Sequence, residues 1–227
     1  MKKNIYILFF IFITSNINCQ NKSDRIKSVS DFFNHQVSEK KLVAEIDFSK
    51  SESTLVKDIE KQLNIDLCDN SSFIGKINFN NVEINFPAFV MKNCKRERAN
   101  LHNIISIYIN QKNEILVNEK IIESTKNIES EVLKITKNKI LGTSRKSLIY
   151  LIKWNNHSTP IQTKKIFFEI LLAIRSYSNE LAEKIYNKDI SELSEKELSE
   201  LNKKFTGNIC FVDYFKPIPI PPMPTKQ

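Results

Sequence analysis

Apolar residues recur along this chain at two spacings, one typical of strands and one typical of helices. Alternation of apolar and polar positions predicts strands over residues 42–48 and 105–109, and short apolar runs predict strands over 115–118 and 209–212. The segment SLIYLIKW, residues 147–154, is almost entirely apolar. It therefore predicts a central strand covered on both faces.

Two pairs of strands are predicted to form hairpins. KINF and VEINF are separated by Asn80 and Asn81, and asparagine tolerates the positive φ angles that a two-residue hairpin turn requires. The strands over 105–109 and 115–118 are joined by the turn-forming stretch NQKNE. This spacing predicts a second hairpin.

Apolar residues three and four positions apart predict a short amphipathic helix within residues 22–40. Val29, Phe32, Phe33 and Val37 would share one face of this helix. The face would pack on the body of the protein.

Capping residues mark where the later helices begin. Ser51 or Ser53 begins a helix that ends at Leu63, and Ser124 begins another. Apolar side chains on one face of each helix predict that both pack against a sheet.

The last two helices carry stronger signals. Thr159 precedes Pro160, and proline at the first helical position costs no hydrogen bond because that N–H has no partner in a helix. The apolar stripe continues to Ile185. Ser194 and Glu197 have the spacing of a capping box and begin a final short helix.

From residue 105 onward the order is strand, strand, helix, strand, helix, helix, strand. This order predicts an α+β fold, a small mixed sheet with helices packed on one face, preceded by a smaller αβ extension. The expected divisions are a signal peptide over 1–18, a tether and short helix over 19–40, a strand–helix–hairpin segment over 41–86, a linker over 87–103, a main domain over 104–213 and a Pro-rich tail over 214–227.

The first residues are typical of an export signal. Lys2 and Lys3 precede an apolar run over residues 5–13, which is about half the length of a membrane-spanning helix. Cys19 follows, where bacterial lipoproteins carry their acylated cysteine, although the preceding NIN departs from the usual small residues. We therefore predict export and lipid attachment at Cys19, on the periplasmic side of a bacterial membrane. Cleavage without lipidation and an uncleaved anchor are the alternatives.

The other cysteines, Cys68, Cys94 and Cys210, allow at most one disulfide and leave one thiol free. Their spacing does not match a zinc site, so no metal is expected. Gly75, Gly142 and Gly207 are the chain's three glycines. They are too few and too far apart for a phosphate-binding loop, so no nucleotide cofactor is expected.

The formal charge of +8 comes from interspersed residues rather than from a basic stripe with aromatic platforms. Nucleic-acid binding is therefore not expected. One basic cluster, formed by Lys92, Lys95, Arg96 and Arg98, is the best surface candidate for an acidic partner or anionic lipid. The alternative is a solvated linker.

Candidate catalytic groups do not converge along the sequence. His35, His102 and His157 are scattered, and a nucleophile elbow is lacking. His157 is better explained as a capping or solvent-facing residue, and Trp154, at the end of an apolar strand, as core. No catalytic residue is predicted, so the protein is expected not to be an enzyme.

The second half of the chain contains the predicted hairpin NIISIYINQKNEILVNEK, followed by a buried strand and a Thr-Pro helix start. This order resembles the periplasmic domain of the ExbD/TolR biopolymer-transport proteins. The family's pattern in the long helix and beyond is matched by Arg175, Glu180, Leu181, Ala182, Lys184, Tyr186, Lys188, Leu193, Ser194 and Glu195. The resemblance covers roughly residues 86–213.

The sequence departs from the family at the membrane. Family members carry a transmembrane helix with an embedded Asp that takes up a proton, whereas residues 4–14 contain no Asp, Glu or Lys. Ile161 replaces the family's aromatic residue after the proline. Residues 22–85 have no counterpart and are either a second, diverged copy or an unrelated extension.

The resemblance implies a non-enzymatic docking module of the envelope, without the family's motor. Its implied partners are TonB/TolA-like or ExbB/TolQ-like proteins, peptidoglycan, or a second copy of the chain. We expect partner binding along the first family-like hairpin, through Ile105, Ile107, Ile109, Ile115 and Val117. The alternatives are an ExbD-type subunit of a transport complex with an uncleaved anchor, and an unrelated structural lipoprotein.

Overall fold

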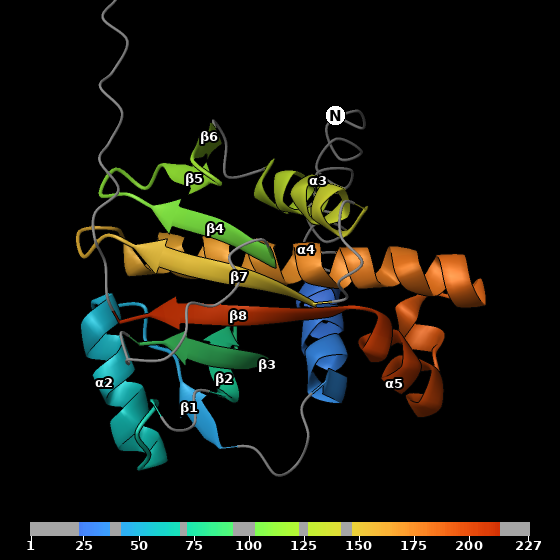
Figure 1. Cartoon of the computed structure of the whole chain (residues 1–227), viewed down its shortest axis with the longest axis horizontal. Coiled ribbons are helices and arrows are strands. Elements are labelled where there is room, and N and C mark those ends of the chain that lie inside the picture. The colour runs from blue at the N-terminus through green and yellow to red at the C-terminus, as the bar shows by residue number, and fades with distance from the viewer. Residues whose placement is uncertain are drawn as a thin grey trace, which may run out of the picture.

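A computed structural model describes residues 23–36, 42–68, 72–92, 103–122, 127–141 and 147–213 of the chain. The described strands form one eight-stranded mixed sheet in the order β1-β2-β3-β8-β7-β4-β5-β6, with helices packed on it (Figure 1). The predicted α+β class is confirmed.

The strands are β1 (Val43–Glu45), β2 (Ser72–Phe79), β3 (Val82–Met91), β4 (Ile104–Ile109), β5 (Ile115–Val117), β6 (Lys120–Ile122), β7 (Ser147–Trp154) and β8 (Thr206–Val212). The helices are a first helix over residues 23–36, then α2 (Glu52–Leu63), α3 (Ile128–Leu141), α4 (Pro160–Tyr186) and α5 (Glu195–Lys204), with a 3-10 turn over Ile190–Glu192 before α5.

Four neighbouring strands at the centre of the sheet, β3, β8, β7 and β4, run parallel. The arrowheads of β4, β7 and β8 consequently point to the same side of the molecule in Figure 1. Their carboxyl ends meet at one edge, which is where open α/β sheets commonly bind ligands.

The linker predicted over residues 87–103 is wrong for residues 87–91, which belong to β3. β3 pairs with β8 from Ala88 to Met91, so the sheet runs across the expected domain boundary. The sequence favours a linker here because Pro87 has no N–H to donate to a strand ladder. It is tolerated here because pairing with β8 begins only at the next residue.

Both predicted hairpins are confirmed. Asn80 and Asn81 have positive φ angles of 49° and 64° between β2 and β3, and β4 pairs antiparallel with β5. The sequence did not predict β6, which follows β5 through a second two-residue turn at Asn118 and Glu119. β6 therefore becomes one end of the sheet.

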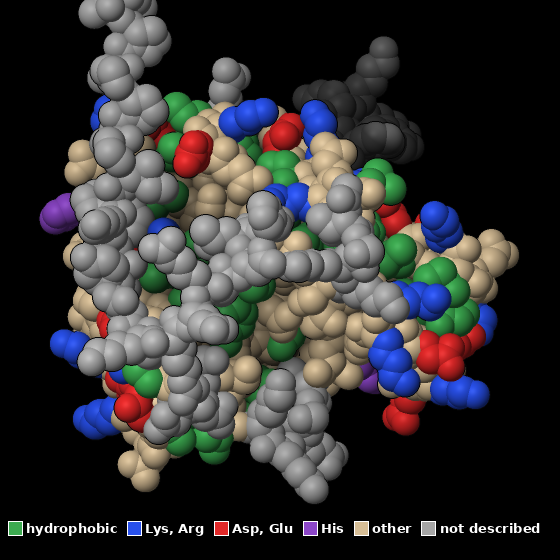
Figure 2. Space-filling view, viewed as in Figure 1, with side chains coloured by type: hydrophobic (Ala, Val, Ile, Leu, Met, Phe, Trp, Pro, Cys, Tyr) green, Lys and Arg blue, Asp and Glu red, His purple; other side chains and the backbone are tan. Residues whose placement is uncertain are grey.

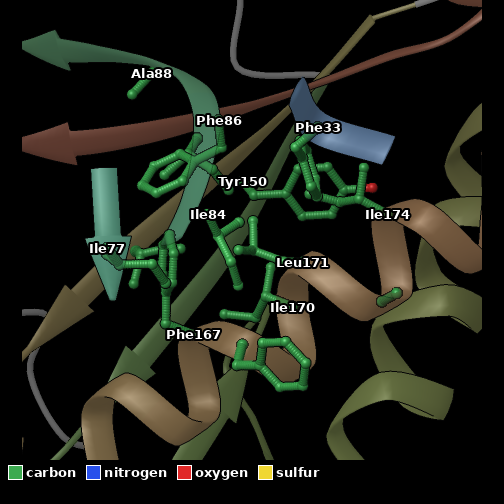
Figure 3. Close-up of a cluster of buried hydrophobic side chains, with 14 of the residues drawn as sticks. Phe33, Ile77, Ile84, Phe86, Ala88, Tyr150, Phe167, Ile170, Leu171 and Ile174 are labelled. Atoms are coloured by element: carbon green, nitrogen blue, oxygen red, sulfur yellow. The ribbon is translucent and has the colours of Figure 1, made fainter. Parts of the chain in front are cut away.

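Helix α4 covers the centre of the sheet, behind β7 in the view of Figure 1. Figure 3 shows Ile84 and Phe86 of β3 facing Phe167 and Leu171 of α4 across the core. The ring of Phe167 lies 5.0 Å from that of Phe86, centroid to centroid. Because α4 is buried along most of its length, it fixes the strands that it crosses.

The helix caps follow the sequence closely. Ser51 caps α2 by accepting a hydrogen bond from the Thr54 N–H, and Ser194 forms the predicted capping box with Glu197 before α5. Thr159 is the N-cap of α4, but its side chain does not cap the helix. The Thr159 hydroxyl accepts a hydrogen bond from the Asn113 amide instead.

The prediction that β7 is covered on both faces is only half right. β7 lies inside the sheet, between β8 and β4. Leu148, Tyr150, Ile152 and Trp154 are buried on the α4 side, while the alternate residues are exposed or half-buried. The apolar run thus reflects an interior strand that is fully buried on one face only.

Gly75 provides a test of packing between β2 and β3, where it pairs with Phe86. A Cβ atom at this position would lie 2.5 Å from the buried Phe86 ring. We expect Gly75→Ala to lower the free energy of unfolding by about 1–3 kcal/mol, as measured by urea denaturation. In the Gly75→Ala/Phe86→Leu double variant, the two losses should be less than additive because Leu makes room. Additive losses would contradict this contact.

Candidate functional site

A cleft of about 480 Å³ lies at the carboxyl ends of the parallel strands. Its lining comes from the start of α2, from β4, from the end of β7 with the loop that follows it, and from the residue after β8. The lining residues are Ser51, Glu52, Ser53, Tyr108, Trp154, Asn155, Asn156, His157 and Asp213. This volume is within the range of sites for small ligands.

One carboxyl group joins the two sides of the cleft. Glu52 Oε1 accepts a 2.8 Å hydrogen bond from the backbone N–H of Trp154, 102 residues away in the sequence. The Trp154 indole N–H donates to the Lys50 carbonyl at 3.0 Å. These two bonds tie the start of α2 to the end of β7.

Trp154 is 4% exposed, as expected for a core residue. Its ring makes edge contacts with Phe48 at 5.4 Å and with Phe211 at 6.3 Å. The indole therefore supports the floor of the cleft, and its backbone and indole N–H groups hold the α2 side in place.

The loop after β7 is held by hydrogen bonds of its own. Asn155 donates its N–H to the Ile109 carbonyl at the end of β4 and accepts from the His157 N–H through its side chain. The Asn113 side chain accepts from the Thr159 N–H. The turn between β4 and β5 thereby fixes the loop that carries Asn156 and His157 into the cleft.

Burial raises the pKa of Glu52 from an ordinary carboxyl value to about 7. The hydrogen bond from the Trp154 N–H and the nearby charge of Lys153 oppose this rise but do not cancel it. Near neutral pH, Glu52 can therefore exist in either charge state, which is uncommon for a carboxyl group outside a functional site.

Among the described residues, no group of His, Cys, Asp and Glu side chains could hold a metal ion. Glu52, His157 and Asp213 line the same cleft, but they do not form such a group. What the arrangement offers is two carboxyl groups beside amide and hydroxyl side chains, a set suited to binding a polar ligand.

The hairpin expected to bind a partner does not supply exposed apolar side chains. Its five residues, Ile105, Ile107, Ile109, Ile115 and Val117, are at most 1% exposed. Their side chains belong to the core, and β4 is an interior strand between β7 and β5. The prediction that these side chains meet a partner is therefore wrong, because their alternation reflects burial.

Of the basic cluster, Lys92 has a structural role. Lys92 forms ion pairs with Glu60 at 2.6 Å and with Asp66 at 3.8 Å, so it fastens the end of β3 to α2 and the turn after it. Lys95, Arg96 and Arg98 lie outside the described residues, as does Cys19. Figure 2 shows basic and acidic side chains scattered together over the visible face.

The cysteines agree with the expectation of at most one disulfide and a free thiol. Cys68 is disulfide-bonded. Cys210 is a buried free thiol, and burial raises its pKa to about 12. A thiol in this state is not reactive.

Comparison with models of known protein families, with curated proteins and with solved structures finds no match for this chain. The resemblance to ExbD/TolR proteins therefore stays a prediction.

The buried Glu52 has a measurable consequence for stability. Its folded pKa lies above its unfolded value, so stability falls as pH rises from about 4.5 towards 7 and the carboxyl ionises. Gln at this position keeps an acceptor for the Trp154 N–H without the charge. We expect Glu52→Gln to raise the free energy of unfolding by about 1–3 kcal/mol at about pH 8 and to change it little at about pH 5.

Urea denaturation at the two pH values checks this expectation. Glu119→Gln, at an exposed turn position, is the matched control and should change stability equally little at both. An effect of Glu52→Gln that does not depend on pH would show that Glu52 ionises normally in the folded protein.

Proposed function

We propose that the protein is an exported, non-enzymatic docking module of the bacterial envelope, held at the membrane by a lipid on Cys19. It docks by adding an extended segment of a partner to the open end of its sheet at β6. The partner is an envelope protein of the TonB/TolA or ExbB/TolQ kind, or a second copy of the chain.

The observation that carries the docking proposal is a contrast between the two ends of the sheet. At the β1 end, the Gln62 side chain of α2 accepts from the Glu45 N–H at 2.8 Å and donates to the Glu45 carbonyl at 3.2 Å. This clamp occupies the outward N–H and carbonyl of Glu45, the last residue of β1. Natural proteins protect edge strands in such ways against unwanted pairing.

The β6 end lacks such a clamp among the described residues. Val117 pairs with Lys120 across a two-residue turn, and residues that flank such a turn share the ladder hydrogen bonds. Ile121, the next residue, therefore directs its N–H and carbonyl away from β5. Its side chain is 65% exposed, so an apolar contact is available beside these outward-facing backbone groups.

Two features support export. The short apolar leader is typical of a signal peptide, and a disulfide at Cys68 is typical of proteins that mature outside the cytosol. Within the described residues, none of the helices has the length and apolar character needed to cross a membrane.

A photo-reactive residue at Lys120 tests docking in intact host cells. We expect a discrete cross-linked product, with a yield several-fold lower in Ile121→Pro because proline removes the outward N–H. Ile121→Thr keeps that N–H and should lose less. The same photo-reactive residue at Glu45, whose outward backbone groups Gln62 occupies, is the control and should give no product. Equal yields from the two ends would contradict docking at β6.

Labelling with radioactive palmitate tests the anchor. The wild-type chain should incorporate label and fractionate with membranes, whereas Cys19→Ala should lose the label because the acylated thiol is gone. Cys68→Ala, which leaves the attachment site intact, should keep it. An unlabelled wild-type chain that retains its leader would favour the uncleaved anchor of an ExbD-type subunit instead.

A further inference from the structure

The cleft at the ends of β4, β7 and β8 differs in charge from the rest of the protein. The chain carries a formal charge of +8, yet the described residues that line the cleft include Glu52 and Asp213 and neither Lys nor Arg. A concave site lined by one sign of charge concentrates ligands of the opposite sign. The cleft therefore favours a cation.

Glu52 is placed to meet that cation. Oε1 is occupied by the Trp154 N–H, while Oε2 makes no hydrogen bond within the part of the chain that the structure describes. A carboxylate that has lost most of its water is costly to ionise unless an opposite charge comes close. A bound cation supplies that charge and recovers the cost.

We propose that this cleft binds the primary ammonium group of a small organic molecule, with Glu52 as its counter-ion. An ammonium group has three N–H donors. Glu52 Oε2 accepts one, and the hydroxyl and amide oxygens of Ser53 and Asn156 are available for the others. Asp213, which lines the same cleft, adds negative charge. The site is independent of the lipid anchor and of docking at β6, and so goes beyond both.

The size of the cleft limits the ligand. A volume of about 480 Å³ suits a molecule of the size of an amino acid or a diamine, or one long side chain of a larger partner. Two sources share this chemistry, a free amine and the lysine side chain of a peptide. Cadaverine represents the first, and lysine with an acetylated α-amine and an amidated carboxyl represents the second.

Binding should depend on pH through Glu52. The groups that face the cleft are Glu52 from α2, Tyr108 from β4, His157 from the loop after β7 and Asp213 after β8, with Lys153 of β7 acting on Glu52 through its charge. Below about pH 7 the carboxyl takes up a proton, and affinity should fall about tenfold per pH unit. His157→Gln should keep this dependence, because the titrating group is Glu52.

Calorimetric titration of the full chain in detergent at about pH 8 tests the site. Both amines are titrated, together with the lysine derivative acetylated on its ε-amine, which keeps the shape and loses the charge. We expect at least one amine to bind, the acetylated compound not to bind, and Glu52→Gln to weaken binding at least tenfold. Glu119→Gln, which removes the same charge at an exposed turn position outside the cleft lining, should bind as the wild type does.

The compounds that bind identify the class of ligand. Binding of cadaverine alone assigns a free amine, and binding of the lysine derivative assigns a peptide side chain. Equal binding by Glu52→Gln, equal binding of the ε-acetylated compound, or no binding of either amine at millimolar concentration would overturn the proposal. Circular dichroism of Glu52→Gln, which keeps the acceptor for Trp154, shows that lost binding does not reflect unfolding.

Discussion

Phe167 lies where helix α4 crosses the centre of the sheet, and its ring contacts Phe48, Phe86 and Phe211. These three rings come from the segment after β1, from β3 and from β8, so one side chain binds parts of the chain that are far apart in sequence. Aromatic side chains bury more area than any others. The flat face that α4 covers, and with it the alignment of the strand ends that form the cleft, depends on this cluster.

The cleft depends on that core in a specific way. Trp154 belongs to the aromatic cluster through Phe48 and Phe211, and its backbone N–H holds Glu52. The core fixes the Trp154 ring, and the Trp154 N–H in turn holds the Glu52 carboxyl group in a poorly hydrated position. The same packing that stabilises the sheet therefore sets the charge state of the group beside the cleft.

Local features of the fold could be predicted from the sequence because they depend on neighbouring residues. The Asn80-Asn81 turn, the Ser51 cap and the capping box at Ser194 are of this kind. The pairing of β3 with β8 cannot be predicted in this way because it joins Ala88 to Ile209, and no local pattern encodes such a contact. The sequence also does not single out Glu52 as a site residue, because an acidic residue in the first turn of a helix is common. Only its contact with a residue 102 positions away makes it unusual.

The position of β8 has a consequence for how the chain is made. Among the described strands β8 comes last in the sequence, yet it lies between β3 and β7 and joins the two halves of the sheet. The sheet cannot close until residues 206–212 are available, so its two parts, β1-β2-β3 and β7-β4-β5-β6, stay unjoined until every other described strand has been made.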